Sequence, residues 1–274
     1  MTAPTLSTIR RAWVNRSVVI STLFPGGRIV WRIIDLRIRL QALRLLARTW
    51  HAMYQPIPFA EFLDLTPEQN RASEDRWAVM RAVLPEDISH LRFLDLGAAE
   101  GFFSLKCAKE GATAIALERD AVRVKLMGLV KNRYGLRRFH PRHADLTKID
   151  LRSLGDFDYA FFLNVHQHVY RIDPQAARRN LSDLGAMCSR GIFLEARPTE
   201  FGLEIAVRDP DNPQPFRRID DLIKAVKAGT GFTESTELHY TANIGTPKDM
   251  ESVPEGAEVR YRLFYLTRPG PQTY

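Results

Sequence analysis

Residues 93–105 read FLDLGAAEGFFSL, and this stretch decides the fold. A short apolar run contains Asp95, two glycines follow at Gly97 and Gly101, and apolar residues then recur at helical spacing. This order predicts a buried strand, a tight turn and the beginning of a helix. Such a turn exposes backbone N–H groups beside a surface that a ligand can approach closely. We therefore expect a ligand-binding strand–turn–helix here.

Strand and helix patterns alternate after this stretch. Strands are expected at 92–96, 113–118, within 139–146, at 158–165 and at 191–197, and helices at 102–111, 120–135 and 176–188. Such an alternation predicts a doubly wound α/β fold. A helix at 218–231 is then followed by two strands, 237–242 and 260–268, with no helix between them. Consecutive strands of this kind predict an antiparallel hairpin at the sheet edge.

We therefore expect an α/β fold with a doubly wound, mostly parallel seven-stranded sheet and an antiparallel C-terminal edge hairpin. A basic helical N-terminal segment, residues 1–55, precedes it. Residues 56–90 are expected to form a connector and a lid helix that Ser73 caps. Residues 91–274 are expected to form the ligand-binding domain.

The positive charge of the chain lies at its start. The net charge is +7, yet residues 1–50 contain nine arginines and one acid, Asp35, so the remaining residues carry a net charge of −1. The stretch 28–50 lacks glycine and proline and is expected to be helical. Three interpretations stay open: a helix packed on the body, a basic element at an anionic membrane surface, and an arm that binds nucleic acid.

Several protein classes are disfavoured. The apolar stretch before Pro25 is short for a signal peptide, and no run approaches the length of a membrane span. The only two cysteines, Cys107 and Cys188, are far apart, which argues against a zinc site or a disulfide framework. We expect a cytoplasmic protein, associated with the inner face of the membrane if the arginine-rich segment binds lipid.

The spacing of the turn distinguishes two ligand classes. A dinucleotide-binding fingerprint aligned on Gly97 requires glycine at position 99 and a small residue at position 102. The sequence has Ala99 and Phe102 instead. A phenylalanine at that point would separate the helix from the strand, so a diphosphate ligand is disfavoured.

The pattern Asp-x-Gly-x-x-x-Gly resembles motif I of class I S-adenosylmethionine-dependent methyltransferases, and the resemblance covers about residues 75–200. It implies S-adenosylmethionine as methyl donor and S-adenosylhomocysteine as product. It places Glu118 at the ribose, Asp145 near the adenine amino group and Asn164 facing the methyl group. Ala99 departs from the family, in which glycine is common. The expected cofactor-binding residues are Arg76, Trp77, Asp95, Gly97, Ala99, Gly101, Phe102, Glu118, Arg119, Asp145, Leu146 and Asn164.

Candidate catalytic residues follow the fourth core strand in LNVHQHVYR. Histidine titrates near neutral pH and suits a general base that removes a hydroxyl proton. We prefer His166 as base and name His168 second, with a structural role as the alternative for each. Glu195, at the end of the fifth strand, is expected to orient a histidine or bind the acceptor. A Mg²⁺ site at His166 and Glu195 is conceivable but disfavoured.

The stretch from RASEDRWAVMRAVLP to LNVHQHV resembles one subgroup of the family. That subgroup includes tRNA wobble-uridine carboxymethyltransferases and methyltransferases of surface-polysaccharide assembly. The resemblance does not fix the substrate, and our first hypothesis is an O-methyltransferase acting on a sugar hydroxyl of a glycan or glycolipid. The alternative is a tRNA-modifying enzyme, and a further alternative is a non-catalytic binding module. The near-neutral body disfavours nucleic acid as partner; the sequence does not indicate the oligomeric state.

Overall fold

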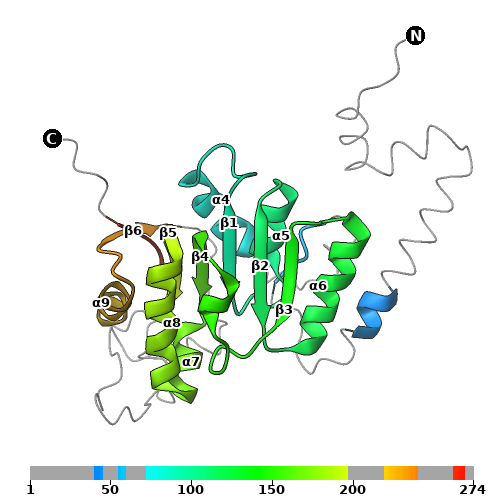
Figure 1. Cartoon of the computed structure of the whole chain (residues 1–274). Coiled ribbons are helices and arrows are strands. Elements are labelled where there is room, and N and C mark those ends of the chain that lie inside the picture. Colours follow the sequence, from blue (N-terminus) through cyan, green and yellow to red (C-terminus); the bar gives the residue numbers. More distant parts are fainter. Residues whose placement is uncertain (1–39, 46–54, 60–71, 197–218, 240–261, 269–274) are drawn as a thin grey trace, which may run out of the picture.

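The computed structural model describes residues 40–45, 55–59, 72–196, 219–239 and 262–268. They form one seven-stranded sheet in the order β3-β2-β1-β4-β5-β7-β6 (Figure 1). The strands are β1 (Arg92–Leu96), β2 (Thr113–Glu118), β3 (Phe139–His143), β4 (Phe157–Leu163), β5 (Cys188–Ala196), β6 (Glu234–Leu238) and β7 (Arg262–Thr267). The first five strands run parallel to one another, as expected.

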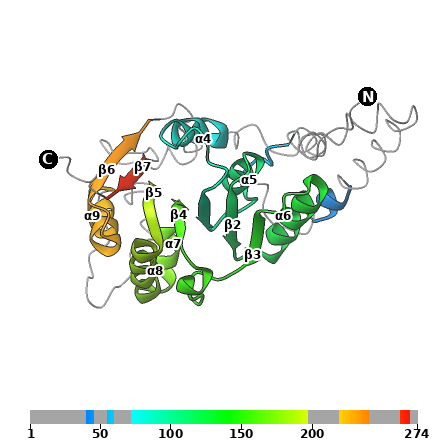
Figure 2. The same cartoon turned by 45° about the horizontal axis from the view of Figure 1, so that its top comes forward.

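The helices are α4 (Ala72–Ala82), α5 (Phe102–Lys109), α6 (Ala121–Tyr134), α7 (His166–Ile172), α8 (Pro174–Met187) and α9 (Ile219–Thr230). They cover both faces of the sheet (Figure 2). Because successive strand residues point to opposite faces, Phe93 packs with the cluster that contains α5 and α6, whereas Leu94 packs with the cluster that contains α8. Burial on both faces explains why these strands are apolar throughout.

The antiparallel C-terminal edge is confirmed. β7 pairs antiparallel with both β5 and β6, so the last described strand lies between them. β6 begins at Glu234, earlier than the expected range of 237–242, and part of that range lies outside the described residues. The antiparallel pairing at the edge thus follows the prediction, while the boundary of β6 differs from it.

Two local expectations are corrected. Ser73 lies inside α4 rather than before it, and its hydroxyl accepts a hydrogen bond from the Arg76 guanidinium at 3.0 Å. No helix was predicted directly after β4, but the residues there form α7. A seven-residue helix with apolar residues at Val169 and Tyr170 is too short to give a strong helical period in the sequence.

The expected N-terminal helix at 28–50 lies mostly outside the described residues. Its described part, residues 40–45, is helical and buries Ala42 in the same cluster as α6. Helices in the described part of the chain lack the combination of length and apolar character that a membrane crossing requires. The division at residues 55 and 90 stays a prediction.

Candidate functional site

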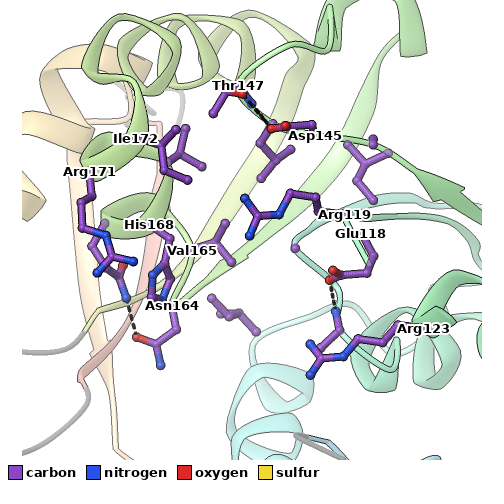
Figure 3. Close-up of a pocket in the computed structure, with 18 of the residues that line it drawn as sticks. Glu118, Arg119, Arg123, Asp145, Thr147, Asn164, Val165, His168, Arg171 and Ile172 are labelled. Atoms are coloured by element: carbon purple, nitrogen blue, oxygen red, sulfur yellow. Dashed lines mark hydrogen bonds between the residues drawn. The ribbon is translucent and has the colours of Figure 1, made fainter. Parts of the chain in front are cut away.

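A cavity of about 490 Å³ lies at the carboxyl ends of the parallel strands (Figure 3). Parallel α/β sheets place ligands at this edge, where the strand order reverses. The cavity is lined by Gln55, Gly97, Ala99, Leu117, Glu118, Arg119, Arg123, Ala144, Asp145, Leu146, Thr147, Leu163, Asn164, Val165, Gln167, His168, Val169, Arg171 and Ile172.

The turn after β1 has a left-handed backbone at three positions. Gly97, Ala99 and Gly101 have φ angles of 70°, 50° and 80°. A Cβ atom at Gly97 would lie 2.6 Å from a methyl group of Val165, and one at Gly101 would lie 2.5 Å from the sulfur of Met127. Both glycines are therefore required by close approach as well as by conformation. At Ala99, the left-handed conformation costs about 1–2 kcal/mol.

Glu118 holds this turn in place. One oxygen of its carboxylate accepts the Ala99 N–H at 2.9 Å, and the other accepts the Asp120 N–H at 2.8 Å. The end of β2 is thereby tied to the turn after β1, and the strained Ala99 gains a charge-assisted hydrogen bond. Each oxygen keeps a further lone pair for a ligand.

Asp95 lies beneath the turn rather than in the cavity. Its buried carboxylate accepts the Ser104 hydroxyl at 2.8 Å, which ties β1 to the first turns of α5. Burial, with a smaller contribution from the charge of Glu118, raises the pKa of Asp95 to about 7 against the lowering effect of Ser104. Asp95 thus supports the turn instead of contacting a ligand in the cavity.

Gln55, the last residue before the expected connector, supplies a wall of the cavity that the motif analysis missed. The amide oxygen of Gln55 accepts the Phe102 N–H at 3.2 Å, and the Gln55 N–H donates to Glu100 at 2.9 Å. Glu100 is 2% exposed and faces the Arg123 guanidinium at 3.4 Å. Gln55 therefore caps the beginning of α5, where a free N–H would otherwise attract an anion.

Asp145 closes the far side of the cavity. Its carboxylate accepts both the backbone N–H and the hydroxyl of Thr147, and these hydrogen bonds hold the pKa of Asp145 below its usual value. The side chain of Asn180 donates to the carbonyl of Leu146 at 2.9 Å. The loop after β3 is thus anchored at two points, with Asp145 and Leu146 on the cavity wall.

Asn164 follows β4 and has a φ angle of 59°, a conformation that asparagine tolerates better than most residues. Its side-chain amide donates to Glu195 at 3.3 Å and accepts from Gln167 at 3.1 Å. Glu195 is buried and pairs with Arg76 at 2.8 Å. Glu195 thus contacts both Asn164 and Arg76.

The order of preference for the two histidines is reversed. His166 is 2% exposed, does not line the cavity, and packs against Phe162 and Tyr170. Its burial lowers its pKa to about 4, and its Nδ1 has no hydrogen-bond partner among the described residues. His168 lines the cavity beside Asn164 (Figure 3), and burial together with Arg171 and Arg119 lowers its pKa.

The structure brings together most of the predicted ligand-contacting residues. The cavity is lined by Gly97, Ala99, Glu118, Arg119, Asp145, Leu146, Asn164 and His168. It is not lined by Arg76, Trp77, Asp95, Gly101, Phe102, His166 or Glu195. Trp77 belongs to the buried core, so its expected role as a cover for the cofactor is not supported.

Gln55, Arg123, Gln167 and Arg171 were not predicted to line the site, although they do. Gln167 and Arg171 lie one helical turn apart on α7, so they could have been found only if that helix had been recognised. Within the described ranges, no group of three or more His, Cys, Asp or Glu side chains could hold a metal ion.

Comparisons with known proteins agree with this geometry. No protein-family model matches the chain. The O-antigen chain terminator bifunctional methyltransferase/kinase WbdD of Escherichia coli is 30% identical over 127 residues, which are 45% of this chain and 18% of that protein. A medium-resolution structure of WbdD superposes with a TM-score of 0.59 at 20% identity and covers 82% of this chain and 46% of that chain.

The N-terminal domain of EvdMO1, crystallised in the presence of SAH and D-fucose, superposes with a TM-score of 0.57 at 19% identity. The match covers 85% of this chain and 95% of that domain. The chain has a methyltransferase fold. The resemblance to methyltransferases predicted from the turn, Glu118, Asp145 and Asn164 is thereby confirmed. The chain spans less than half the length of WbdD.

The raised pKa of Asp95 predicts a pH-dependent stability. Between about pH 4 and pH 7 the folded protein binds this proton and the unfolded chain does not, so the contribution of Asp95 to stability falls as the pH rises. Asp95→Asn removes the free-energy cost of ionising a buried carboxyl group and retains an oxygen that accepts the Ser104 hydroxyl. We expect the variant to gain up to about 4 kcal/mol over the wild type between pH 4 and pH 8, measured by urea unfolding.

Asp145→Asn provides the matched control, because the pKa of Asp145 is lowered and its contribution to stability is present above its unfolded pKa. This variant should lose stability relative to the wild type as the pH rises from 2 to about 5. A flat difference between Asp95→Asn and wild type across the pH range would contradict the buried, proton-binding carboxyl.

Proposed function

We propose that this protein is an S-adenosylmethionine-dependent methyltransferase that acts on a sugar hydroxyl. One observation carries the proposal: Asp145, Glu118, Gly97 and Asn164 follow four adjacent strands, in the order β3, β2, β1 and β4, and all line one cavity. This row supplies a polar group, a carboxylate, an open glycine turn and an amide along a path suited to an extended nucleoside with an amino-acid tail. WbdD supports the assignment through its name, and EvdMO1 supports it through the SAH bound to its N-terminal domain.

The methyl donor would lie across the strand ends. The free lone pairs of Glu118 would accept the two ribose hydroxyls, and Asp145 would face the adenine with Leu146 against the ring. Gly97 and Asn164 both line the cavity, and the amino-acid portion would lie next to them. The arrangement disfavours a diphosphate, because Gln55 already occupies the Phe102 N–H at the start of α5.

Methyl transfer requires in-line attack and the removal of one proton. We assign the base to His168. Its imidazole would take the proton of the acceptor hydroxyl as the oxygen forms a bond to the methyl carbon. The sulfur–methyl bond breaks, and its electron pair stays on sulfur, which becomes a neutral thioether. Burial, with smaller contributions from Arg171 and Arg119, lowers the pKa of His168, which favours the unprotonated imidazole that can act as a base at neutral pH.

Sugar is the acceptor class that the surroundings of His168 support best. Arg119 and Arg171 present hydrogen-bond donors at the cavity, and Ile172 is 56% exposed beside them. A pyranose offers hydroxyl acceptors for the guanidinium groups and an apolar ring face for Ile172. The D-fucose in the EvdMO1 crystals is of this chemical class.

Donor binding provides the direct test of the proposed function. We expect SAH to bind the wild type in calorimetry, and Gly97→Ala to weaken binding at least ten-fold because its Cβ would meet Val165. Gly135→Ala is the matched control, since Gly135 has a similar φ of 62° with no atom within 4 Å of an added Cβ. Failure of the wild type to bind SAH, or binding of a dinucleotide in its place, would overturn the proposal.

The assignment of His168 predicts a pKa that responds to its neighbours. In NMR titrations, the His168 ring should titrate below pH 6.5, and Arg119→Gln should raise that pKa because a lowering charge is removed. With a panel of free and nucleotide-linked sugars as acceptors, His168→Ala should lower methyl transfer about 10²–10⁴-fold while SAH affinity is kept. If His168→Ala keeps its turnover and His166→Ala is folded but inactive, the general base is His166 and not His168.

We also propose that the protein works in the cytoplasm against an anionic membrane surface. Residues 119–143 contain eight lysines or arginines and one acid, and they form α6 and the edge strand β3. Residues 40–45 lie beside α6 in both views and expose Leu40 and Leu43 by 43% and 42% (Figures 1 and 2). Exposed leucines next to cationic side chains favour a lipid surface over RNA.

Vesicle flotation tests this membrane proposal. The wild type should float with phosphatidylglycerol vesicles and not with phosphatidylcholine vesicles. Leu40→Ser with Leu43→Ser should reduce flotation several-fold, whereas Val83→Ser, at another exposed apolar residue, should not. Equal flotation of the double variant and wild type would contradict the proposal, and salt-sensitive retention of tRNA would replace it by the RNA alternative.

A further inference from the structure

A buried ion pair joins α4 to the end of β5. The Arg76 guanidinium donates to Glu195 at 2.8 Å, and the two side chains are 9% and 1% exposed. Arg76 also donates to Ser73 and lies over the ring of Phe103. Burying two charges costs several kcal/mol per ion, so such a pair is weak evidence for stability and calls for another role.

The charge of Glu195 fixes the direction of the next hydrogen bond. A carboxylate can only accept, so the Asn164 side chain must turn its Nδ2 toward Glu195, as the 3.3 Å contact requires. The Oδ1 of Asn164 then points to Gln167, which must present its Nε2 at 3.1 Å. The nitrogen and oxygen positions of both amides therefore follow from the chemistry of Glu195.

Both amides belong to the cavity wall. Asn164 and Gln167 line the cavity, whereas Arg76 and Glu195 lie behind them. Because β4 lies next to β1, Asn164 adjoins the glycine turn at the end of the row that would hold the amino-acid portion of the donor. That portion carries an ammonium group, which only donates hydrogen bonds and needs oxygen acceptors.

We propose that the Arg76–Glu195 pair is a positioning device that sets the amide oxygen of Asn164 as an acceptor for the ammonium group of the methyl donor. The inference rests on the proposed function and adds two residues outside the cavity to it. Arg76 compensates the Glu195 charge, Glu195 orients Asn164, and Asn164 orients Gln167. With glutamine at position 195, which both donates and accepts, each amide can turn over and the preference for an ammonium is lost.

The test separates hydrogen-bond direction from stability. Arg76→Gln leaves a buried Glu195 charge without this partner and should lower the melting temperature by several degrees. The double variant Arg76→Gln with Glu195→Gln removes both charges and should recover most of that loss. This double variant cannot restore the direction of the Asn164 amide. It should therefore regain thermal stability without regaining ligand selectivity.

Selectivity is measured by calorimetry with two probes, SAH and its analogue in which hydrogen replaces the α-amino group. The wild type should bind SAH at least ten-fold more tightly than the analogue, because hydrogen bonds to charged groups are the stronger ones. Glu195→Gln and the double variant should reduce this ratio about ten-fold through weaker SAH binding, with the analogue's affinity unchanged.

A matched ion pair serves as control. Arg262 and Glu237 pair at 2.7 Å between β6 and β7, and neither lines the cavity. Glu237→Gln with Arg262→Gln should leave the SAH-to-analogue ratio unchanged. A stable Arg76→Gln/Glu195→Gln variant with the wild-type ratio, or an equal loss for both ligands, would overturn the positioning role. Absence of SAH binding in the wild type would instead overturn the proposed function.

Discussion

The structure depends on the hydrogen bond between the Glu118 carboxylate and the Ala99 N–H. The turn after β1 holds three residues in left-handed conformations, and only two of them are glycines. Glu118 offsets the strain at Ala99 and joins the ends of β1 and β2 across the cavity. Glu118, which was expected mainly to bind ribose, therefore also stabilises the turn after β1, against which a ligand would lie. Ligand contact and turn geometry share one side chain, so changes at position 118 affect both.

The polar groups around the cavity are organised in layers. Asp95 and Ser104 support the turn from below, Gln55 and Glu100 close its side, and Asp145 is fixed by Thr147. These contacts fix the orientation of the groups that line the cavity before a ligand binds, which reduces the entropy lost on binding. Asn164 follows the same principle, since its amide is held on both sides before any ligand arrives.

Local sequence patterns predicted the fold because the buried strands are short apolar runs separated by clear turns. The glycine spacing around Ala99 and the acids that end β2 and follow β3 also identified the cavity. Contacts between distant segments were not predictable in this way. No local pattern links Arg76 to Glu195, 119 positions later, or Gln55 to Phe102. His166 and His168 look equivalent in the sequence, yet opposite faces of α7 bury one and expose the other. The sequence shows only that both residues are histidines. The packing of α7 on the core determines which of the two is exposed to solvent.

Gln55 precedes the sheet by many residues, and yet its amide completes the wall beside the first N–H of α5. Ile57 is fully buried, and Phe59 stacks on Tyr134 with ring centroids 3.7 Å apart, so the segment is fastened to α5 and α6 immediately after Gln55. The conventional boundary of a nucleotide-binding fold, drawn just before its first strand, would sever this piece. A fragment cut at that boundary would have a cavity open to water on one side. The segment needed to bind a ligand is thus longer than the segment needed to form the sheet.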